Sequence, residues 1–250
     1  MTRSDFDLSD FPEVQRQFEA DLPQLLIHCA AMSDPTVCET QHTLTRLVNR
    51  EATFYLSGLA QDIPMIFISS DLVFDGKHGN YTEQDEPSPL TFYARTKAEA
   101  EALVLANLLH SVVRTTLTAG KSPNSDRGIE EQLRLRWAKG DTVKLFIDEY
   151  RCPIPAEVTA RGIWELALAK RPGLYHLAGS QRLSRLEIGQ AIAESHPEWN
   201  PKIESCSLRD YDGPPRAPDT SLDCGKLQQI LSFPLTGLRE WLVSSATQPA

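Results

Sequence analysis

Short apolar runs alternate with longer helical patterns over most of this sequence, and that alternation constrains the fold more than any other feature. Strand-like runs rich in β-branched and aromatic residues occupy 25–31, 64–70, 111–116, 143–148 and 173–179. Because these runs are almost continuously apolar, we expect strands that are buried on both faces. Helical periodicity fills the intervals, over 12–22, 41–60, 92–109, 125–139 and 155–170. Strand and helix in alternation predict an α/β fold, a doubly wound parallel sheet with helices on both faces.

The pattern changes after about residue 178. Helical segments dominate there, with one short strand candidate at 203–208 and a proline-rich link at 211–221. We therefore expect residues 1–178 to form the larger α/β domain and residues 179–250 to form a small second lobe, to which residues 118–140 contribute.

Composition places the chain among ordinary globular proteins. A length of 250 residues with 41% hydrophobic and 24% charged residues is enough to bury a substantial core. No apolar run approaches the roughly 20 residues of a membrane-spanning helix, and the N-terminus lacks the apolar core of a secretory signal, so a cytoplasmic protein is expected. A net charge of −9 argues against nucleic-acid binding, which usually requires a basic face.

The cysteines indicate neither a disulfide framework nor a metal site. They are odd in number, widely scattered and in no C-x-x-C pair. We expect all of them to be buried free thiols. They are Cys29, Cys38, Cys152, Cys206 and Cys224.

Small and polar residues follow three of the predicted strands. They are Ala30 and Ala31, the serine pair with Asp71 at 69–71, and Thr115 with Thr116. Ligands of doubly wound sheets bind beyond the carboxyl ends of the strands, so these residues are candidates for a ligand site. The alternative is that they are ordinary turn residues at strand ends.

Tyr93 and Lys97 are four residues apart in a predicted helix, which places both side chains on one helix face. A nearby ammonium favours the phenolate and would lower the pKa of Tyr93 from the ordinary tyrosine value near ~10, so that Tyr93 exchanges a proton with a carbonyl/alcohol pair. A hydroxyl from Ser69 or Ser70 would hydrogen-bond the same oxygen. Such a trio suits hydride transfer from a nicotinamide. The Tyr-x-x-x-Lys spacing alone arises by chance with a probability of roughly 0.2, so its context decides.

That context resembles the extended short-chain dehydrogenase/reductases, in particular the dTDP-4-dehydrorhamnose reductase (RmlD-like) branch. The resemblance rests on "SSDLVFDG", "YTEQDEPSPLTFYARTK" and "VVRTT". It continues through "DEYRCPIPAEVTARGIWEL", "GLYHLAGSQRLSRLEIGQAIA" and "PPRAPDTSLDCGKL", and so covers nearly the whole chain. It implies a Rossmann-like NAD(P)-binding domain, a substrate-binding second lobe, and reduction of a nucleotide-linked 4-keto sugar in dTDP-rhamnose biosynthesis.

The resemblance also implies roles for single residues. Ser70 matches the catalytic Ser/Thr, Tyr93 the proton donor, and Lys97 the residue that tunes Tyr93 and contacts the nicotinamide ribose. Arg216 matches a substrate-lobe segment near the sugar nucleotide, for which a solvated turn charge is the alternative. Further cofactor-binding residues are implied near the adenine, the ribose and diphosphate, and the nicotinamide. They are Asp7, Ala30, Ala31, Ser69 and Thr115.

The glycine-rich turn of that family has no counterpart here. The family opens with a strand, a turn of the G-x-x-G-x-x-G kind and a helix whose N-terminus receives the cofactor diphosphate, whereas the first glycine of this chain is Gly58. The resemblance therefore implies that roughly the first forty residues of the fold are absent, through a misassigned start or in a truncated paralogue. NADP or NAD would then lack the main-chain donors of the turn.

Two functions fit these motifs. One is the reductase, which implies a nucleotide-sugar substrate and NADP or NAD. The other is a non-catalytic sugar-nucleotide-binding or regulatory subunit, because "IHCAA", "ISSD" and "LDCGKL" also resemble the β regulatory subunit of methionine adenosyltransferase, a member of the same family. The second function implies a protein partner, or a homodimer.

Overall fold

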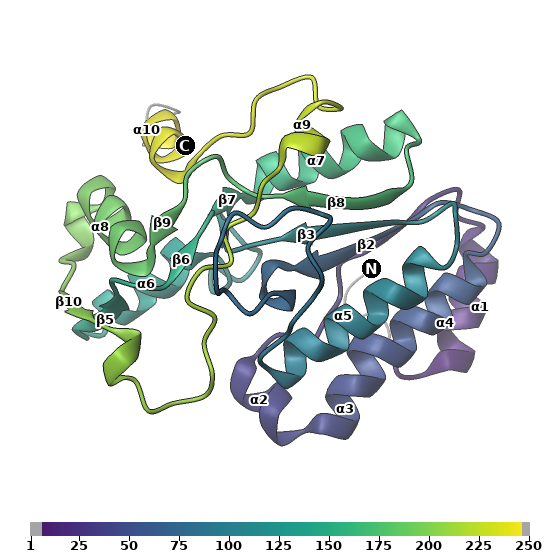
Figure 1. The fold of residues 1–250 in the computed structure, drawn as a ribbon, viewed down its shortest axis with the longest axis horizontal. Coiled ribbons are helices and arrows are strands. Elements are labelled where there is room, and N and C mark those ends of the chain that lie inside the picture. The colour runs from purple at the N-terminus through teal and green to yellow at the C-terminus, as the bar shows by residue number, and fades with distance from the viewer. Residues whose placement is uncertain (1–6, 247–250) are drawn as a thin grey trace.

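Four parallel strands form the central sheet of the computed structural model, which describes residues 7–246 (Figure 1). Across the sheet the order is β1 (Leu26–His28), β2 (Met65–Ser70), β3 (Ser111–Thr115) and β8 (Gly173–Leu177). All neighbours are parallel, and the register places Ser70 opposite Thr115. The predicted parallel α/β sheet is confirmed, and the carboxyl ends of its strands share one edge.

Helices cover both faces of this sheet (Figure 1). On one face, Met65 and Phe67 of β2 belong to an apolar cluster completed by α1 (Phe11–Asp21), α4 (Ala52–Leu59) and α5 (Phe92–Leu105). On the other face, Ile66 and Ile68 belong to a cluster completed by α7 (Ala156–Ala169) and α9 (Gly225–Gln228). Successive residues of a strand point to opposite faces, so a strand covered on both sides is apolar along its whole length. This is why β2 has no polar residue before its final serine pair.

The predicted helix over 41–60 contains an irregular turn. After α2 (Pro35–Thr40), the helices α3 (His42–Arg46) and α4 are joined by a π-helical turn, η1 (Leu47–Glu51). Asn49 lies within η1 and is buried. π-turns inside helices frequently occur at functional sites. Asn49 binds the segment that follows β1, as described below.

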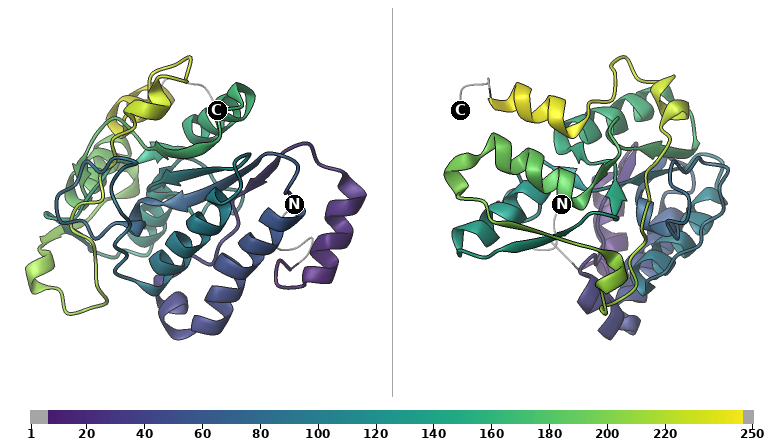
Figure 2. Two further views of the ribbon diagram at one scale, coloured as in Figure 1. Left: turned by 45° about the vertical axis from the view of Figure 1, so that its right-hand side comes forward. Right: turned by 60° about the vertical axis from the view of Figure 1, so that its left-hand side comes forward.

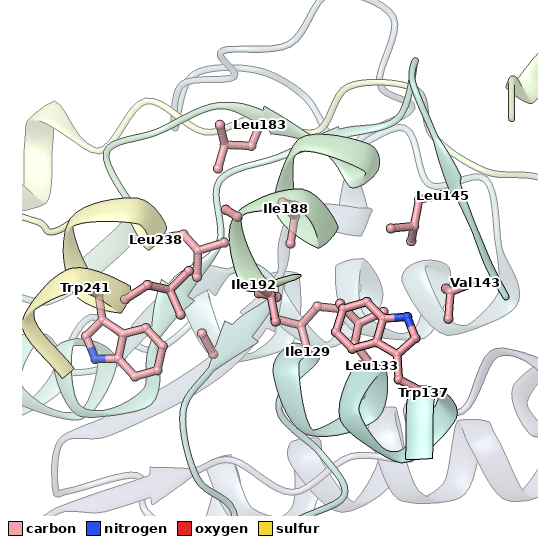
Figure 3. Close-up of a cluster of buried hydrophobic side chains, with 13 residues drawn as sticks. Ile129, Leu133, Trp137, Val143, Leu145, Leu183, Ile188, Ile192, Leu238 and Trp241 are labelled. Carbon is pink, nitrogen blue, oxygen red and sulfur yellow. The ribbon is translucent and has the colours of Figure 1, made fainter. Parts of the chain in front are cut away.

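The part of the fold beside the sheet has a hydrophobic cluster of its own, called the second cluster because it is separate from the two faces of the sheet (Figure 3). It is formed by β5 (Val143–Phe146), β10 (Ile203–Cys206), α6 (Ile129–Ala138), α8 (Arg185–Ser195) and α10 (Leu238–Ala246). In this cluster β5 pairs in parallel with β10, so the prediction that the run 143–148 joins the central sheet is wrong. The reason lies in the run itself, because buried Val143 and Leu145 flank exposed Lys144. Such alternation is typical of a strand with one solvated face.

Short strands and turns connect the sheet to this second cluster. β4 (Thr118–Ala119) pairs with β7 (Ile154–Pro155), and β6 (Tyr150–Arg151) pairs with β9 (Leu183–Ser184). Three single turns of 3-10 helix also occur, at η2 (Asp71–Val73), η3 (Pro197–Trp199) and η4 (Leu208–Asp210).

The segment 217–223 returns from the second cluster to the sheet. It follows η4 and leads into α9, and Figure 2 shows its course between the two parts of the fold. Leu222 forms a β-bridge with Tyr81, and Asp219 forms one with Tyr150. Residues far apart in the sequence therefore meet beside the sheet.

Within residues 7–246, no helix is long and apolar enough to cross a membrane, and no cluster of His, Cys, Asp or Glu is arranged to hold a metal ion. All five cysteines are free thiols. Cys38 and Cys152 are buried, Cys206 and Cys224 are half-buried and Cys29 is exposed, so the prediction of burial is wrong for Cys29 and holds only in part for Cys206 and Cys224. The position of Cys29 explains this, because it directly follows β1 at the open edge of the sheet.

Candidate active site

The carboxyl ends of β1, β2 and β3 carry most of the predicted site residues. Ala30 and Ala31 follow β1, Ser69 and Ser70 end β2, and Thr115 ends β3. The hydroxyls of Ser69 and Thr115 are buried and have no hydrogen-bond partner among the described residues. A buried hydroxyl without a partner costs about 1–3 kcal/mol, and such groups often mark a place where a ligand binds.

Tyr93 is held at the start of α5 by two contacts of its neighbours. Thr91 caps the helix by accepting a hydrogen bond from the Ala94 amide at 3.2 Å, and the Glu39 carboxylate accepts one from the Phe92 amide at 2.6 Å. Burial raises the pKa of Tyr93 to about 12, although a hydrogen bond with the Ser70 side chain opposes that rise. The structure thus brings Tyr93 and Ser70 together. The predicted lowering of the Tyr93 pKa is wrong for this structure, because burial of the phenol outweighs the neighbouring groups.

Lys97 lies one helical turn beyond Tyr93 and is 2% exposed. Its Nζ donates a hydrogen bond to the Ile68 carbonyl at 2.6 Å and lies 3.9 Å from the centre of the Phe67 ring. Burial lowers the pKa of Lys97 to about 7, while Glu101 and Cys29 act in the opposite direction. Lys97 therefore binds the backbone of β2, the strand that ends in the serine pair.

Glu101 continues the same face of α5 and forms a buried ion pair with Arg114 of β3. Arg114 donates from Nε to Glu101 Oε1 at 3.1 Å and from Nη2 to Oε2 at 2.7 Å. The two side chains are only 3% and 4% exposed. Arg114 Nη1 also lies 3.4 Å from Nε2 of His176 on β8. This pair fixes the helix of Tyr93 and Lys97 to the sheet.

Asn49 fixes the segment that follows β1, and sequence reasoning missed it. Its Oδ1 accepts a hydrogen bond from the Met32 amide at 2.8 Å, and its Nδ2 donates to the Met32 carbonyl at 3.0 Å. The same Nδ2 donates to the Thr96 hydroxyl of α5 at 3.2 Å. Asn49 thus ties the chain after Ala31 to the helix of Tyr93. The signal available in the sequence is a polar residue, Asn49, directly after the apolar residues Leu47 and Val48 of a predicted helix.

Asp71 lies directly beside Ser70. The Ser70 hydroxyl donates to Asp71 Oδ1 at 3.2 Å, and it accepts a hydrogen bond from the Leu72 amide at 3.1 Å as the cap of η2. The hydroxyls of Thr116 and Thr220 both donate to Asp71 Oδ2 at 2.8 Å. Thr220 lies in the returning segment and could not be found by its spacing in the sequence.

Two other predicted residues lie outside this cluster. The Asp7 carboxylate accepts hydrogen bonds from the amide and the hydroxyl of Ser9 at 2.9 and 2.8 Å, which shapes the turn before α1. Arg216 donates from Nε to Glu149 Oε2 at 2.6 Å and from Nη2 to Glu149 Oε1 at 3.0 Å. Arg216 is therefore ion-paired with a buried carboxylate, and its own side chain is 33% exposed.

A cavity of about 200 Å³ lies in front of Arg216, in the second cluster. Its lining combines apolar residues with four basic side chains, and the Phe146 ring lies 5.1 Å from the Arg216 guanidinium. The basic residues are Arg136, Lys144, Arg185 and Arg216. Burial lowers the pKa of Arg185 to about 10, and the charge of Glu149 opposes that change. Four basic side chains around one hollow are suited to bind an anionic group.

The sheet, its two helical layers and the serine–tyrosine–lysine edge define a Rossmann-like α/β protein. The chain belongs to the RmlD substrate binding domain family, which matches residues 1–249.

Individual relatives support the same family and differ in role. The chain is 32% identical to the probable low-salt glycan biosynthesis reductase Agl14 of Haloferax volcanii, over 86% of this chain and 74% of that protein. It is 29% identical to the methionine adenosyltransferase 2 subunit beta of Rattus norvegicus, over 83% of this chain and 65% of the subunit, less than two thirds of its length. The dTDP-4-dehydrorhamnose reductase of Bacillus anthracis, solved in complex with NADP, shares the fold with a TM-score of 0.87 at 21% identity, over 98% of this chain and 87% of that one.

Proposed function

We propose that this protein is an NAD(P)-dependent reductase of a nucleotide-linked 4-keto sugar, of the dTDP-4-dehydrorhamnose kind. Residues 1–178 would serve as the cofactor domain and residues 179–250, with 118–140, as the substrate lobe. The observation that carries this proposal is that Ser70 ends β2 while Tyr93 and Lys97 lie one turn apart on α5, the helix that Lys97 fixes to β2 through the Ile68 carbonyl.

In the proposed reaction Tyr93 donates a proton to the carbonyl oxygen of the sugar as the alcohol forms. Its pKa of about 12 keeps the phenol protonated at neutral pH, the form required of a proton donor. Ser70 hydrogen-bonds the same oxygen and stabilises the negative charge that develops there. Lys97 donates to the Ile68 carbonyl and so holds the end of β2, which carries Ser70, in place beside the helix that carries Tyr93.

The residues at the strand ends fit the nicotinamide end of a cofactor. When bound, NADP or NAD supplies the hydride. The unpaired hydroxyls of Ser69 and Thr115 are the groups best placed to contact it, because binding would satisfy both. We assign Ala30 and Ala31, whose small side chains leave room beyond β1, to the ribose and diphosphate, and Asp7 to the adenine end.

The basic cavity would receive the nucleotide part of the substrate. A sugar nucleotide carries a diphosphate, and guanidinium groups bind phosphate oxygens in pairs of hydrogen bonds. Arg216 and Arg185 line this cavity, and Phe146 offers an aromatic face beside them. We therefore assign Arg216 to substrate binding in this protein.

Reduction of a dTDP-4-keto sugar by the purified chain tests the proposal. Oxidation of NADPH and NADH is followed with the wild type, with Tyr93→Phe and with the matched control Tyr55→Phe, whose hydroxyl bonds to Gln15 on the far helix α1. We expect Tyr93→Phe to lose about 100-fold or more in kcat, as removal of a general acid does, and Tyr55→Phe to retain full activity. A wild type without any reduction, or a fully active Tyr93→Phe, contradicts the reductase.

A second candidate function is a binding or regulatory subunit. The similarity to the methionine adenosyltransferase subunit favours it. Lys97 favours it as well, because its side chain is buried and its Nζ already donates a hydrogen bond to the Ile68 carbonyl. This function requires that dTDP or a dTDP-sugar binds in calorimetry while no reduction occurs. It also requires that the chain forms a complex with a methionine adenosyltransferase catalytic subunit in size-exclusion chromatography.

A further inference from the structure

A chain of buried charged side chains connects Ser70 with the basic cavity. Its three inner members, Asp71, Glu149 and Arg151, are 4%, 2% and 4% exposed. Charged groups are rarely buried to this extent, because their removal from water costs several kcal/mol each unless other charges compensate. The arrangement of these three groups therefore needs a reason beyond chain packing.

Each link of the chain is a direct contact. Asp71 Oδ2 lies 3.6 Å from Arg151 Nε, and Arg151 Nη2 lies 3.1 Å from Glu149 Oε1. Glu149 in turn accepts both hydrogen bonds of the Arg216 guanidinium, at 2.6 and 3.0 Å. The Arg151 guanidinium also donates to the Tyr150 and Ala217 carbonyls at 2.6 and 3.1 Å, so it is held in place between the two carboxylates.

The two ends of this chain differ in their surroundings. At the inner end, the hydroxyls of Thr116 and Thr220 fix one oxygen of Asp71, and the other oxygen accepts from Ser70. At the outer end, the Arg216 side chain is 33% exposed and lines the cavity together with Arg185. An anion in the cavity would therefore reach Arg216 before any of the three buried members.

The charges of the chain do not cancel. Asp71 and Glu149 contribute two negative charges, whereas Arg151, Arg185 and Arg216 contribute three positive charges, and both Arg185 and Arg216 act on Glu149. The excess positive charge lies on the cavity side. A diphosphate there completes the alternation of charges and competes with Glu149 for Arg216.

We propose that Glu149, Arg151 and Asp71 are positioning residues that couple occupancy of the basic cavity by a diphosphate to the orientation of the Ser70 hydroxyl. A diphosphate draws Arg216 away from Glu149, Glu149 then takes a larger share of Arg151, and the released Asp71 carboxylate holds the Ser70 hydroxyl in one orientation. Because that hydroxyl carries a single proton, the coupling sets when Ser70 is free to donate it to the reacting oxygen. The remote part of the substrate thus controls the orientation of the group that meets the reacting oxygen, a use of binding energy common in enzymes. This inference rests on the proposed substrate class.

Hydrogen exchange of the backbone around Ser70 tests the coupling. The exchange of residues 68–74, measured by mass spectrometry, is compared with and without saturating dTDP and, separately, inorganic pyrophosphate. We expect either probe to slow exchange in the wild type by about fivefold or more, the lower range of measured couplings between sites. Affinity is measured in parallel by calorimetry.

Variants of the chain then separate coupling from binding. Glu149→Gln should still bind the probes, but the probes should change its exchange by less than twofold. Arg151→Lys keeps the positive charge and should retain part of the wild-type response. Arg216→Gln removes the contact with Glu149 that the diphosphate is proposed to break, so this variant should show slowed exchange without a probe and no further response to one. It covers the case in which Glu149→Gln does not fold. The control is Glu194→Gln on α8, whose side chain is 74% exposed and which should respond as the wild type does.

The outcomes distinguish the coupling from the proposed function. Wild-type protection that persists unchanged in both Glu149→Gln and Arg216→Gln overturns the coupling and leaves the reductase intact. Binding of pyrophosphate with the expected protection, but no binding of dTDP, supports the coupling and contradicts the substrate class. No binding of either probe overturns both.

Discussion

Removal of one partner of the buried Glu101–Arg114 pair should be among the most destabilising changes in this protein. The pair joins α5 to β3 through a two-pronged contact at 2.7–3.1 Å, with both side chains at most 4% exposed. Breaking such a pair leaves an uncompensated charge in the interior and costs about 3–5 kcal/mol. For a chain of this size each kcal/mol lowers Tm by about 2–4 °C, so Glu101→Leu and Arg114→Met should each lower Tm by roughly 6–20 °C.

The double variant provides the sharper measurement. With Glu101→Leu and Arg114→Met together, no unpaired charge remains, and the double variant should lose much less stability than either single variant, because replacement of a buried ion pair by apolar side chains of similar volume is often neutral. Urea unfolding monitored by tryptophan fluorescence gives the free energy of unfolding of all four proteins. Glu204→Gln is the surface control, since its pair with Lys144 is 54% and 68% exposed and should contribute less than about 1 kcal/mol.

The result that refutes this reasoning is additivity. If the double variant loses the sum of the two single losses within about 0.5 kcal/mol, the two side chains do not interact energetically, and the contact contributes nothing specific to the attachment of α5.

Three further changes have defined outcomes. Gly79→Ala should destabilise the fold by about 1–3 kcal/mol more than Gly140→Ala in urea unfolding, because both glycines have positive φ (+69° and +82°) but only at Gly79 would a new Cβ meet another side chain; equal losses contradict this. Asn49→Leu should cost about 2 kcal/mol or more and speed hydrogen exchange of the Met32 amide, which loses its acceptor; unchanged exchange argues against that role. Burial alone would raise the pKa of Glu131, but hydrogen bonds from the loop before α6 lower it to about 2, below its ordinary 4.5. Glu131 therefore stabilises the fold fully above pH 4.5 and loses this effect as the pH falls towards 2, so the stability difference between the wild type and Glu131→Gln should shrink over that range; a difference independent of pH refutes this.

The sheet could be predicted from the sequence because each of its strands is marked by a local pattern of residues. Four of the five strands predicted for the sheet form it, and each is a run of apolar residues bounded by turn or helix signals. The fifth, β5, pairs outside the central sheet, because exposed Lys144 interrupts its apolar run. The pairing of β5 with β10 joins residues about sixty positions apart, and no local pattern specifies it.

The candidate site divides in the same way. Ser70, Tyr93 and Lys97 lie within one short stretch, so spacing and family resemblance are enough to predict them as site residues. Glu149 and Arg151 were invisible as site residues, because their significance comes from contacts with Asp71 and Arg216. The direction in which the Tyr93 pKa shifts could not be predicted either, because burial of a side chain follows from packing and not from its neighbours in the sequence.

The returning segment 217–223 has a consequence for how the protein is made. Because Thr220 completes the hydrogen bonds of Asp71 and Leu222 pairs with Tyr81, the edge of the sheet that carries Ser70 depends on residues synthesised about 140 positions later. A ribosome adds about 5–20 residues per second, so the edge waits roughly 7–30 seconds for this segment. During translation the strands and helices of the first 178 residues can assemble, while the reactive end of the molecule stays unfinished until nearly the whole chain has emerged. The site therefore forms last, after most of the second lobe has been synthesised.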